Sequence, residues 1–281
     1  MSNSLQEILF VFGQPVAGNP TQFMMERALA EANLDWRYLT LEVPAEKLAD
    51  AIRGARAMNF RGGNITMPHK VAVIEHLDEL SQAAQLMQAV NCIHHHQGRL
   101  LGENTDGKGF LQSLREVRDP AGTQVTILGA GGAARAIAVE LALAQAGKIT
   151  IVNRTPSRGE ELAAVLREKV HVAAEAVGWE KEYEIPPETE ILINGTSIGL
   201  FAEETRVPVK RETLRPNLVV ADVVFSPPET RFLQEAKAAG ATTLDGLGML
   251  VNQAVIGFQI WTGVTPNAAT MREALEEYLS L

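Results

Sequence analysis

Lys70 and Asp106 are the first residues of this chain to suggest a chemistry. Lys70 ends the segment 63–70, and Asp106 lies within the segment 104–107. A lysine and an aspartate beside a bound nicotinamide can move a proton on and off an alcohol while a hydride leaves its carbon. We therefore predict an oxidoreductase. The pair is assigned jointly, because the proton affinities of two interacting groups belong to the pair.

Length, composition and charge narrow the class of protein. The 281 residues exceed the usual size of one compact core, which predicts two domains or one large one. The net charge of -9, without any run of lysine and arginine, argues against nucleic acid as a partner. No uncharged apolar stretch reaches the roughly 18 residues of a membrane span, because Arg135 and Glu140 interrupt the longest apolar run.

The N-terminus and the single cysteine predict where the protein works. The first residues lack the basic region, apolar core and small-residue cleavage site of a secretory signal. Cys92 is the one cysteine, so no internal disulfide can form. Both observations predict a cytoplasmic protein.

The first half of the chain alternates short apolar runs with amphipathic stretches, which is typical of an α/β domain. A helix is expected to begin near Asn19, where a capping side chain precedes a proline. Another is expected to follow Pro44, and a hairpin is expected around Gln97 and Gly98. The strand candidates are residues 8–12, 36–43 and 59–66.

A glycine-rich turn follows the apolar run 125–128. Gly129, Gly131 and Ala134 occupy the three small positions of a dinucleotide-binding turn, and a helix (133–146) and a strand (149–152) follow. Backbone amides at such a helix start attract a pyrophosphate, and small residues let it approach. Gly147 is expected to end the helix. The pattern predicts a doubly wound, Rossmann-type domain.

The end of the second strand predicts which dinucleotide binds. An NAD site usually has an acid here, whereas this chain has Arg154 and Arg158 with the hydroxyls of Thr155 and Ser157. Guanidinium groups pair well with phosphate, so the segment favours NADP through its 2′-phosphate. The alternative is that both arginines are ordinary solvated residues at a helix start.

These segments together resemble the shikimate dehydrogenase family. The resemblance rests on residues 64–70, 89–91, 104–107, the glycine turn, 153–155, 194–199 and 245–250, with Gln253. It implies two α/β domains with the active site between them, and NADP-linked interconversion of 3-dehydroshikimate and shikimate on the route to chorismate and aromatic amino acids. The implied organisation is a substrate domain (1–108), an NADP-binding Rossmann domain (109–248) and a C-terminal helical segment (249–281) that returns to the first domain.

The family's functional residues can be carried over by position. Lys70 resembles the catalytic acid/base, with Asp106 as its partner. The implied substrate-binding residues are Asn19, Thr21, Thr66, Asn91, Phe225 and Gln253. The implied cofactor-binding residues are Gly129, Ala130, Gly131, Gly132, Ala133, Asn153, Arg154, Thr155, Arg158, Thr196, Val223 and Gly246.

Two departures from the family pattern concern the carboxylate end of the substrate. Asn19 and Thr21 stand where the family usually has two serines, and Phe225 stands where it normally has a tyrosine. A hydrogen bond to a charged group contributes roughly 1.5 to 3 kcal/mol, so the missing hydroxyl predicts weaker or altered recognition of the acid. The alternatives are a paralogue for quinate or another hydroxylated ring acid, and a non-catalytic NADP-binding regulator.

Other features predict no further ligand. Adjacent histidines at positions 94–96 alternate faces in a strand and have no second ligand cluster, so we expect no metal. The expected partner is a small hydroxylated ring acid, without nucleic acid or membrane. The sequence leaves the assembly open between a monomer and a homodimer.

Overall fold

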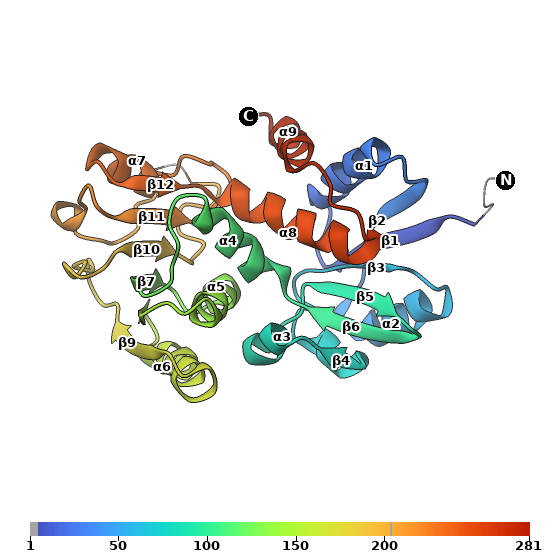
Figure 1. The fold of residues 1–281 in the computed structure, drawn as a ribbon, viewed down its shortest axis with the longest axis horizontal. Coiled ribbons are helices and arrows are strands. Elements are labelled where there is room, and N and C mark those ends of the chain that lie inside the picture. Colours follow the sequence, from blue (N-terminus) through green and yellow to red (C-terminus); the bar gives the residue numbers. More distant parts are fainter. Residues whose placement is uncertain (1–4, 203) are drawn as a thin grey trace. The chain divides into compact units, whose positions relative to one another are not determined.

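The structure is a computed structural model that describes residues 5–202 and 204–281. The chain forms two compact units, one from residues up to 105 together with 251–281, the other from residues 106–250. Each unit is built around a six-stranded sheet (Figure 1). The chain passes between the units within two helices, α4 (Thr105–Arg115) and α8 (Gly246–Thr262). The predicted α/β class is confirmed, as is the return of the C-terminal segment to the first unit.

The strand directions of the first unit bring several loops to one edge of its sheet. β1 is parallel to β2 and β3, β5 runs antiparallel to β3, and β6 is antiparallel to β5. The ends of β1, β2, β3 and β6 therefore lie at the same edge as the start of β5. The strands in sheet order are β2 (Trp36–Glu42), β1 (Glu7–Gly13), β3 (Gly62–Ile65), β5 (Cys92–His96), β6 (Arg99–Glu103) and β4 (Glu79–Leu80).

Local signals position the helices and the hairpin of this unit. Asn19 Oδ1 accepts the backbone N–H of Thr21 at 2.9 Å, which confirms the predicted helix start. Gln97 and Gly98 both have positive φ and join β5 to β6, which confirms the predicted hairpin. The helices are α1 (Thr21–Glu31), α2 (Leu48–Ala57), α3 (Gln82–Met87) and α9 (Ala268–Leu279), with 3-10 turns at Ala45–Lys47 and Ala72–His76.

The C-terminal segment packs on the first unit through Trp261 of α8. Its indole Nε1 donates to the carbonyl of Ile93 at 2.8 Å. The ring lies against Gly62, where an added Cβ would be 2.7 Å from the indole and 2.2 Å from the Ile93 carbonyl. Glycine at position 62 therefore makes room for the tryptophan.

Among the described residues, strand β2 has a sheet partner on one side only, and two side chains of α1 bond to its other side. Glu26 Oε1 accepts the backbone N–H of Tyr38 at 2.6 Å. Gln22 Oε1 accepts that of Thr40 at 3.1 Å. Four helical residues rise about 6 Å and two strand residues about 6.6 Å, so the two bonds form in register.

The second unit has an all-parallel sheet whose chain order reverses between β7 and β10. This is the strand order of dinucleotide-binding folds, in which ligands bind beyond the carboxyl ends of the strands at the reversal. The strands in sheet order are β12 (Thr242–Leu244), β11 (Val219–Asp222), β10 (Ile191–Asn194), β7 (Gln124–Leu128), β8 (Lys148–Asn153) and β9 (Ala173–Gly178). The helices are α5 (Gly132–Leu143), α6 (Pro156–Val165) and α7 (Arg231–Ala238), with a π-helical turn at Leu166–Val170 and a 3-10 turn at Arg211–Thr213.

The predicted end of the helix after the glycine turn was wrong. Helix α5 ends at Leu143, and Gln145 rather than Gly147 adopts positive φ, at 64°. Gly147 is needed for a different reason, since an added Cβ would lie 2.5 Å from the carbonyl oxygen of Gly122. The glycine allows a close approach of two backbones, which the sequence pattern does not distinguish from a helix stop.

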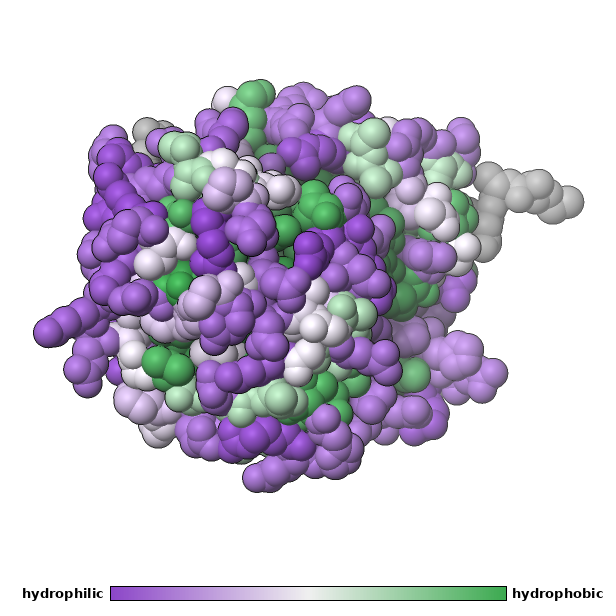
Figure 2. All heavy atoms as spheres, turned by 60° about the vertical axis from the view of Figure 1, so that its left-hand side comes forward, coloured by the Kyte–Doolittle hydropathy of each residue, from purple (hydrophilic) through white to green (hydrophobic). Residues whose placement is uncertain are grey.

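One face of the molecule is mainly polar. Figure 2 shows hydrophilic residues over most of the face turned forward, with hydrophobic residues in small separate areas. Within residues 5–202 and 204–281, no helix has the length and apolar character needed to cross a membrane.

Candidate active site

The residues predicted to bind the cofactor follow the carboxyl ends of successive strands in the second unit. This is the edge at which a doubly wound sheet binds its ligand. Gly129 follows β7, Arg154 follows β8, Thr196 follows β10, Val223 follows β11 and Gly246 follows β12. The parallel sheet thus collects residues that lie more than 100 positions apart along the chain.

The glycine turn at the start of α5 has the shape of an anion site. Gly129 has φ of 106°, and an added Cβ would lie 2.8 Å from Thr196 Cγ2, so the loops after β7 and β10 meet there. A Cβ atom added at Gly131 or Gly132 would meet nothing within 4 Å, and no side chain of the described residues caps the helix. Its first amides and the open space before them fit a pyrophosphate. Ala130 and Ala133, also predicted to bind, lie half-buried in the same turn.

Arg154 and Arg158 are exposed, and their guanidinium groups have no hydrogen bond or ion pair within the described part of the chain. Asn153 Nδ2 donates to the carbonyl of Thr155 at 2.9 Å and so shapes the loop that carries them. Two unpaired guanidinium groups at the end of the second strand fit the 2′-phosphate of NADP.

A buried acid, Asp222, connects the loops that carry Thr196 and Val223. Its carboxylate accepts from Asn194 Nδ2 at 2.9 Å, from Thr230 Oγ1 at 2.8 Å and from the amide that follows Val223 at 3.0 Å. Asn194 Oδ1 in turn accepts the Thr196 hydroxyl at 2.7 Å. Burial outweighs these hydrogen bonds and raises the pKa of Asp222 to about 6.

Replacing Asp222 by asparagine is expected to stabilise the protein near neutral pH. The native pKa of about 6 exceeds the ordinary 3.8, so the native state binds the proton more tightly and stability falls as pH rises between these values. This rise in pKa corresponds to about 3 kcal/mol of unfolding free energy, and above pH 7 the wild-type protein has lost that stability in full. Urea unfolding of both proteins from pH 4 to 8 checks this. A difference that does not grow between pH 4 and 6 would contradict it.

Phe225 lies half-buried on the loop after β11, against a second phenylalanine. Its ring meets Phe201 edge-on, with 6.2 Å between centroids. Phe201 is 76% exposed and has positive φ of 55°, a conformation that is uncommon for a bulky residue.

The candidate substrate residues of the first unit gather at the edge where β1 and β3 end. Gln14 N–H donates to the Met67 carbonyl at 2.9 Å, which ties the loop that leads through Asn19 into α1 to the loop that carries Thr66 and Lys70. The Thr21 side chain is buried, and Thr66 and Lys70 are half-buried.

Asn91 lies at the same edge, directly before β5, and its partner Thr105 follows the end of β6. Asn91 is buried, and its Oδ1 accepts the backbone N–H of Thr105 at 2.7 Å. Thr105 begins α4, and Asp106 follows it in the first turn. The last candidate, Gln253, is a buried residue of α8.

Sequence reasoning missed the buried polar residues that support these loops. His69 Nε2 lies 2.7 Å from the Val43 carbonyl, and a carbonyl only accepts, so this nitrogen carries the proton. Asn64 and Tyr38 are bonded to each other at 2.6 Å. Asn64 and His69 lie inside the motif that ends in Lys70, and Asp222 closes an apolar run. A polar residue inside a buried segment was the available signal in each case.

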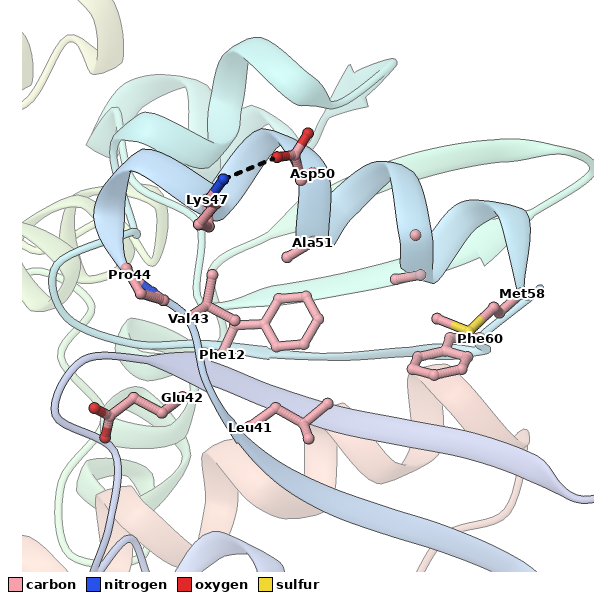
Figure 3. A pocket seen from close by; sticks show the side chains of 12 residues that line it. Phe12, Leu41, Glu42, Val43, Pro44, Lys47, Asp50, Ala51, Met58 and Phe60 are labelled. Atoms are coloured by element: carbon pink, nitrogen blue, oxygen red, sulfur yellow. Dashed lines mark ion pairs between the residues drawn. The ribbon is translucent and has the colours of Figure 1, made fainter.

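A separate cavity of about 430 Å³ lies between α2 and the strands of the first unit (Figure 3). Its lining includes no residue predicted for the active site. It is lined by Phe12, Leu41, Glu42, Val43, Pro44, Lys47, Asp50, Ala51, Gly54, Ala55, Met58 and Phe60.

Family models and individual relatives match the chain along most of its length. The shikimate dehydrogenase substrate binding domain matches residues 11–93, the shikimate/quinate 5-dehydrogenase model matches 113–226, and the shikimate 5′-dehydrogenase C-terminal domain matches 246–276. Shikimate dehydrogenase (NADP(+)) of Methanopyrus kandleri is 43% identical over 97% of this chain and 96% of its own.

Two solved structures show the same fold with different named activities. The ligand-free 5-ketofructose reductase of Gluconobacter sp. strain CHM43 is 52% identical, with a TM-score of 0.96 over 98% of this chain and 99% of its own. Shikimate 5-dehydrogenase from Thermus thermophilus, in complex with NADP(H) and shikimate, is 35% identical, with a TM-score of 0.84 over 97% of this chain and 100% of its own. By these matches, the chain belongs to the shikimate/quinate dehydrogenase family.

Proposed function

We propose that the protein is an NADP-dependent dehydrogenase acting on a CH–OH group, and that it interconverts 3-dehydroshikimate and shikimate on the route to chorismate. The near full-length match to shikimate dehydrogenase (NADP(+)) at 43% identity carries this proposal. The glycine turn and the two unpaired arginines support NADP as the cofactor.

The residues of this chain have separate tasks in that reaction. When bound, the nicotinamide would supply the hydride to the substrate's carbonyl carbon, or accept it from the alcohol carbon in the reverse direction. Lys70 donates a proton to the carbonyl oxygen during reduction and takes it back during oxidation, while the Asp106 carboxylate accepts a hydrogen bond from a substrate hydroxyl. Asn19, Thr21, Thr66, Asn91 and Gln253 orient the ring through neutral hydrogen bonds. A regulator without turnover would have no need of Lys70 and Asp106 together.

A second candidate is the NADPH-dependent reduction of an uncharged polyhydroxylated ketone of the 5-ketofructose type. The 52% identity to 5-ketofructose reductase favours it. The positions expected at the carboxylate end of the pocket point the same way, since Phe225 packs hydrocarbon against Phe201 and has no hydroxyl. An uncharged substrate needs no partner for a carboxylate at that end.

A substrate panel separates these functions. The purified protein is mixed with NADPH and 3-dehydroshikimate or 5-ketofructose, and with NADP and shikimate, quinate or fructose, while reduced nicotinamide is followed. A kcat/KM at least tenfold higher for one substrate assigns the function. Such a preference for quinate assigns the paralogue, and no turnover with any of them contradicts the dehydrogenase proposal.

Replacing Phe225 by tyrosine is expected to raise kcat/KM for shikimate relative to 5-ketofructose by roughly tenfold to a hundredfold. The added hydroxyl supplies a hydrogen bond to a carboxylate, worth about 1.5 to 3 kcal/mol, that the ketose cannot use. Phe60→Tyr adds the same hydroxyl in the separate cavity and serves as the control. An unchanged substrate ratio in Phe225→Tyr would refute the role given to this position.

We also infer that the protein acts in the cytoplasm on small molecules alone, as a monomer or homodimer. The absence of any run of lysine and arginine, and the single cysteine, support this proposal. Sedimentation of the purified protein measures its assembly.

A further inference from the structure

Tyr38 is a buried residue of β2 whose backbone, ring and hydroxyl each contact another residue. Its backbone N–H donates to Glu26, and its ring lies 6.3 Å from that of Trp261. The side chain is fully buried, and its hydroxyl lies 2.6 Å from Asn64 Oδ1. Burial raises the pKa of the Tyr38 phenol, so the group stays a neutral O–H. It is therefore a fixed hydrogen-bond donor.

The Tyr38 hydroxyl and the Asn91 carbonyl together determine which way the Asn64 amide points. Asn64 Nδ2 donates to the backbone carbonyl of Asn91 at 3.2 Å. Turning the amide over would place its oxygen against that carbonyl and its nitrogen against the phenol. Only one orientation satisfies both neighbours, and it requires the Tyr38 hydroxyl as donor.

Asn91 connects Asn64 to the first residue of α4. Its backbone carbonyl accepts from Asn64 and also from Ile65 N–H at 2.8 Å, which fixes the main chain. Its side chain holds Thr105 at both polar groups: the Thr105 N–H donates to Asn91 Oδ1 at 2.7 Å, and the Thr105 hydroxyl lies 3.0 Å from Nδ2 and 3.3 Å from Oδ1. Thr105 is the first residue of α4 and is followed directly by Asp106.

We propose that Tyr38 is a positioning residue of the active site, whose hydroxyl orients Asn64 and thereby Asn91 and the start of α4 with Asp106. The proposal rests on the proposed function, which gives Asn91 and Asp106 to the substrate. Tyr38 itself contacts neither substrate nor cofactor, because its side chain is fully buried and its hydroxyl bonds to Asn64.

The test compares Tyr38→Phe with Tyr183→Phe. The first change removes the hydroxyl and leaves the Asn64 oxygen without its donor. The second removes a half-buried phenol in the other unit. We expect kcat/KM for the ketone substrate to fall about tenfold in Tyr38→Phe, with KM for NADPH within twofold, and to stay unchanged in Tyr183→Phe. Equal effects in the two variants, or a fall only in proportion to lost folded protein, would overturn the proposal.

Two further measurements keep the test decisive. In a cycle with Asn64→Ala, the losses from Tyr38→Phe and Asn64→Ala are expected to be non-additive, whereas additive losses would contradict action through Asn64. Amide hydrogen exchange at Thr105 is expected to be faster in Tyr38→Phe than in wild type. Unchanged exchange would reject the positioning role of Tyr38, and this readout does not depend on turnover. A wild-type protein that turned over no substrate would instead reject the proposed function.

Discussion

Replacing Lys70 by alanine is expected to lower kcat by about 10²- to 10⁴-fold, the usual contribution of a positioned general acid or base. Lys70 lies in the first unit, whereas the glycine turn and Arg154 belong to the second. The dissociation constant for NADPH should therefore stay within about twofold of wild type. Steady-state turnover and a fluorescence titration with NADPH measure the two quantities separately.

Lys47→Ala provides the matched control for this experiment. Lys47 belongs to the same unit, is 64% exposed and pairs with Asp50 at 3.9 Å. Removing its ammonium should leave both turnover and cofactor binding unchanged. If Lys70→Ala weakened NADPH binding as much as turnover, Lys70 would belong to the cofactor site rather than to the chemistry.

Removing both Arg154 and Arg158 is expected to raise KM for NADP by roughly 100-fold or more while leaving KM for NAD nearly unchanged. Each guanidinium can add a charged hydrogen bond worth about 1.5 to 3 kcal/mol, and only NADP carries the 2′-phosphate. Neither arginine has another partner in the described chain, so little folding stability should be lost. Initial rates over a range of each cofactor give both values.

Arg167→Ala controls for the loss of positive charge in the second unit. Arg167 is paired with Glu160 and with the Ala174 carbonyl, so it is already occupied. It should change neither KM. Equal weakening of NADP and NAD in the Arg154/Arg158 variant would show that the arginines hold a part shared by both cofactors.

Much of the second unit could be predicted because its signals are local. The apolar run 125–128, the spacing of Gly129 and Gly131 and the following alanine-rich helix each depend on neighbours a few residues away, and β7 and the start of α5 formed as expected. Gly147 was misread because its role depends on Gly122, which is 25 positions earlier. A close approach of backbones leaves no local pattern.

The supporting network of the candidate site could not be predicted for the same reason. Tyr38, Asn64, Asn91 and Thr105 bond to one another across separations of 14 to 27 residues. Each reads locally as an ordinary polar residue in or beside a strand. Their partners are set by which strands pair, and strand pairing is a non-local choice.

The substrate was the point at which family resemblance and individual residues diverged. The resemblance predicted the reaction from Lys70 and Asp106, while Asn19, Thr21 and Phe225 predicted a change at the carboxylate end. One structure that is 52% identical to this chain is named a ketofructose reductase, so relatives of similar sequence carry names for different substrates. A motif shared by a family identifies chemistry better than it identifies the molecule on which the chemistry acts.

The bonds from Gln22 and Glu26 to β2 have a consequence for self-association. An edge strand with free amides is a template on which another chain can add a strand. Here the amides of Tyr38 and Thr40 are already occupied, so an incoming strand would first have to displace both side chains. The opposite edge is β4, a strand of only two residues. Both edge strands of the first sheet, β2 and β4, thus disfavour the addition of a strand from another molecule.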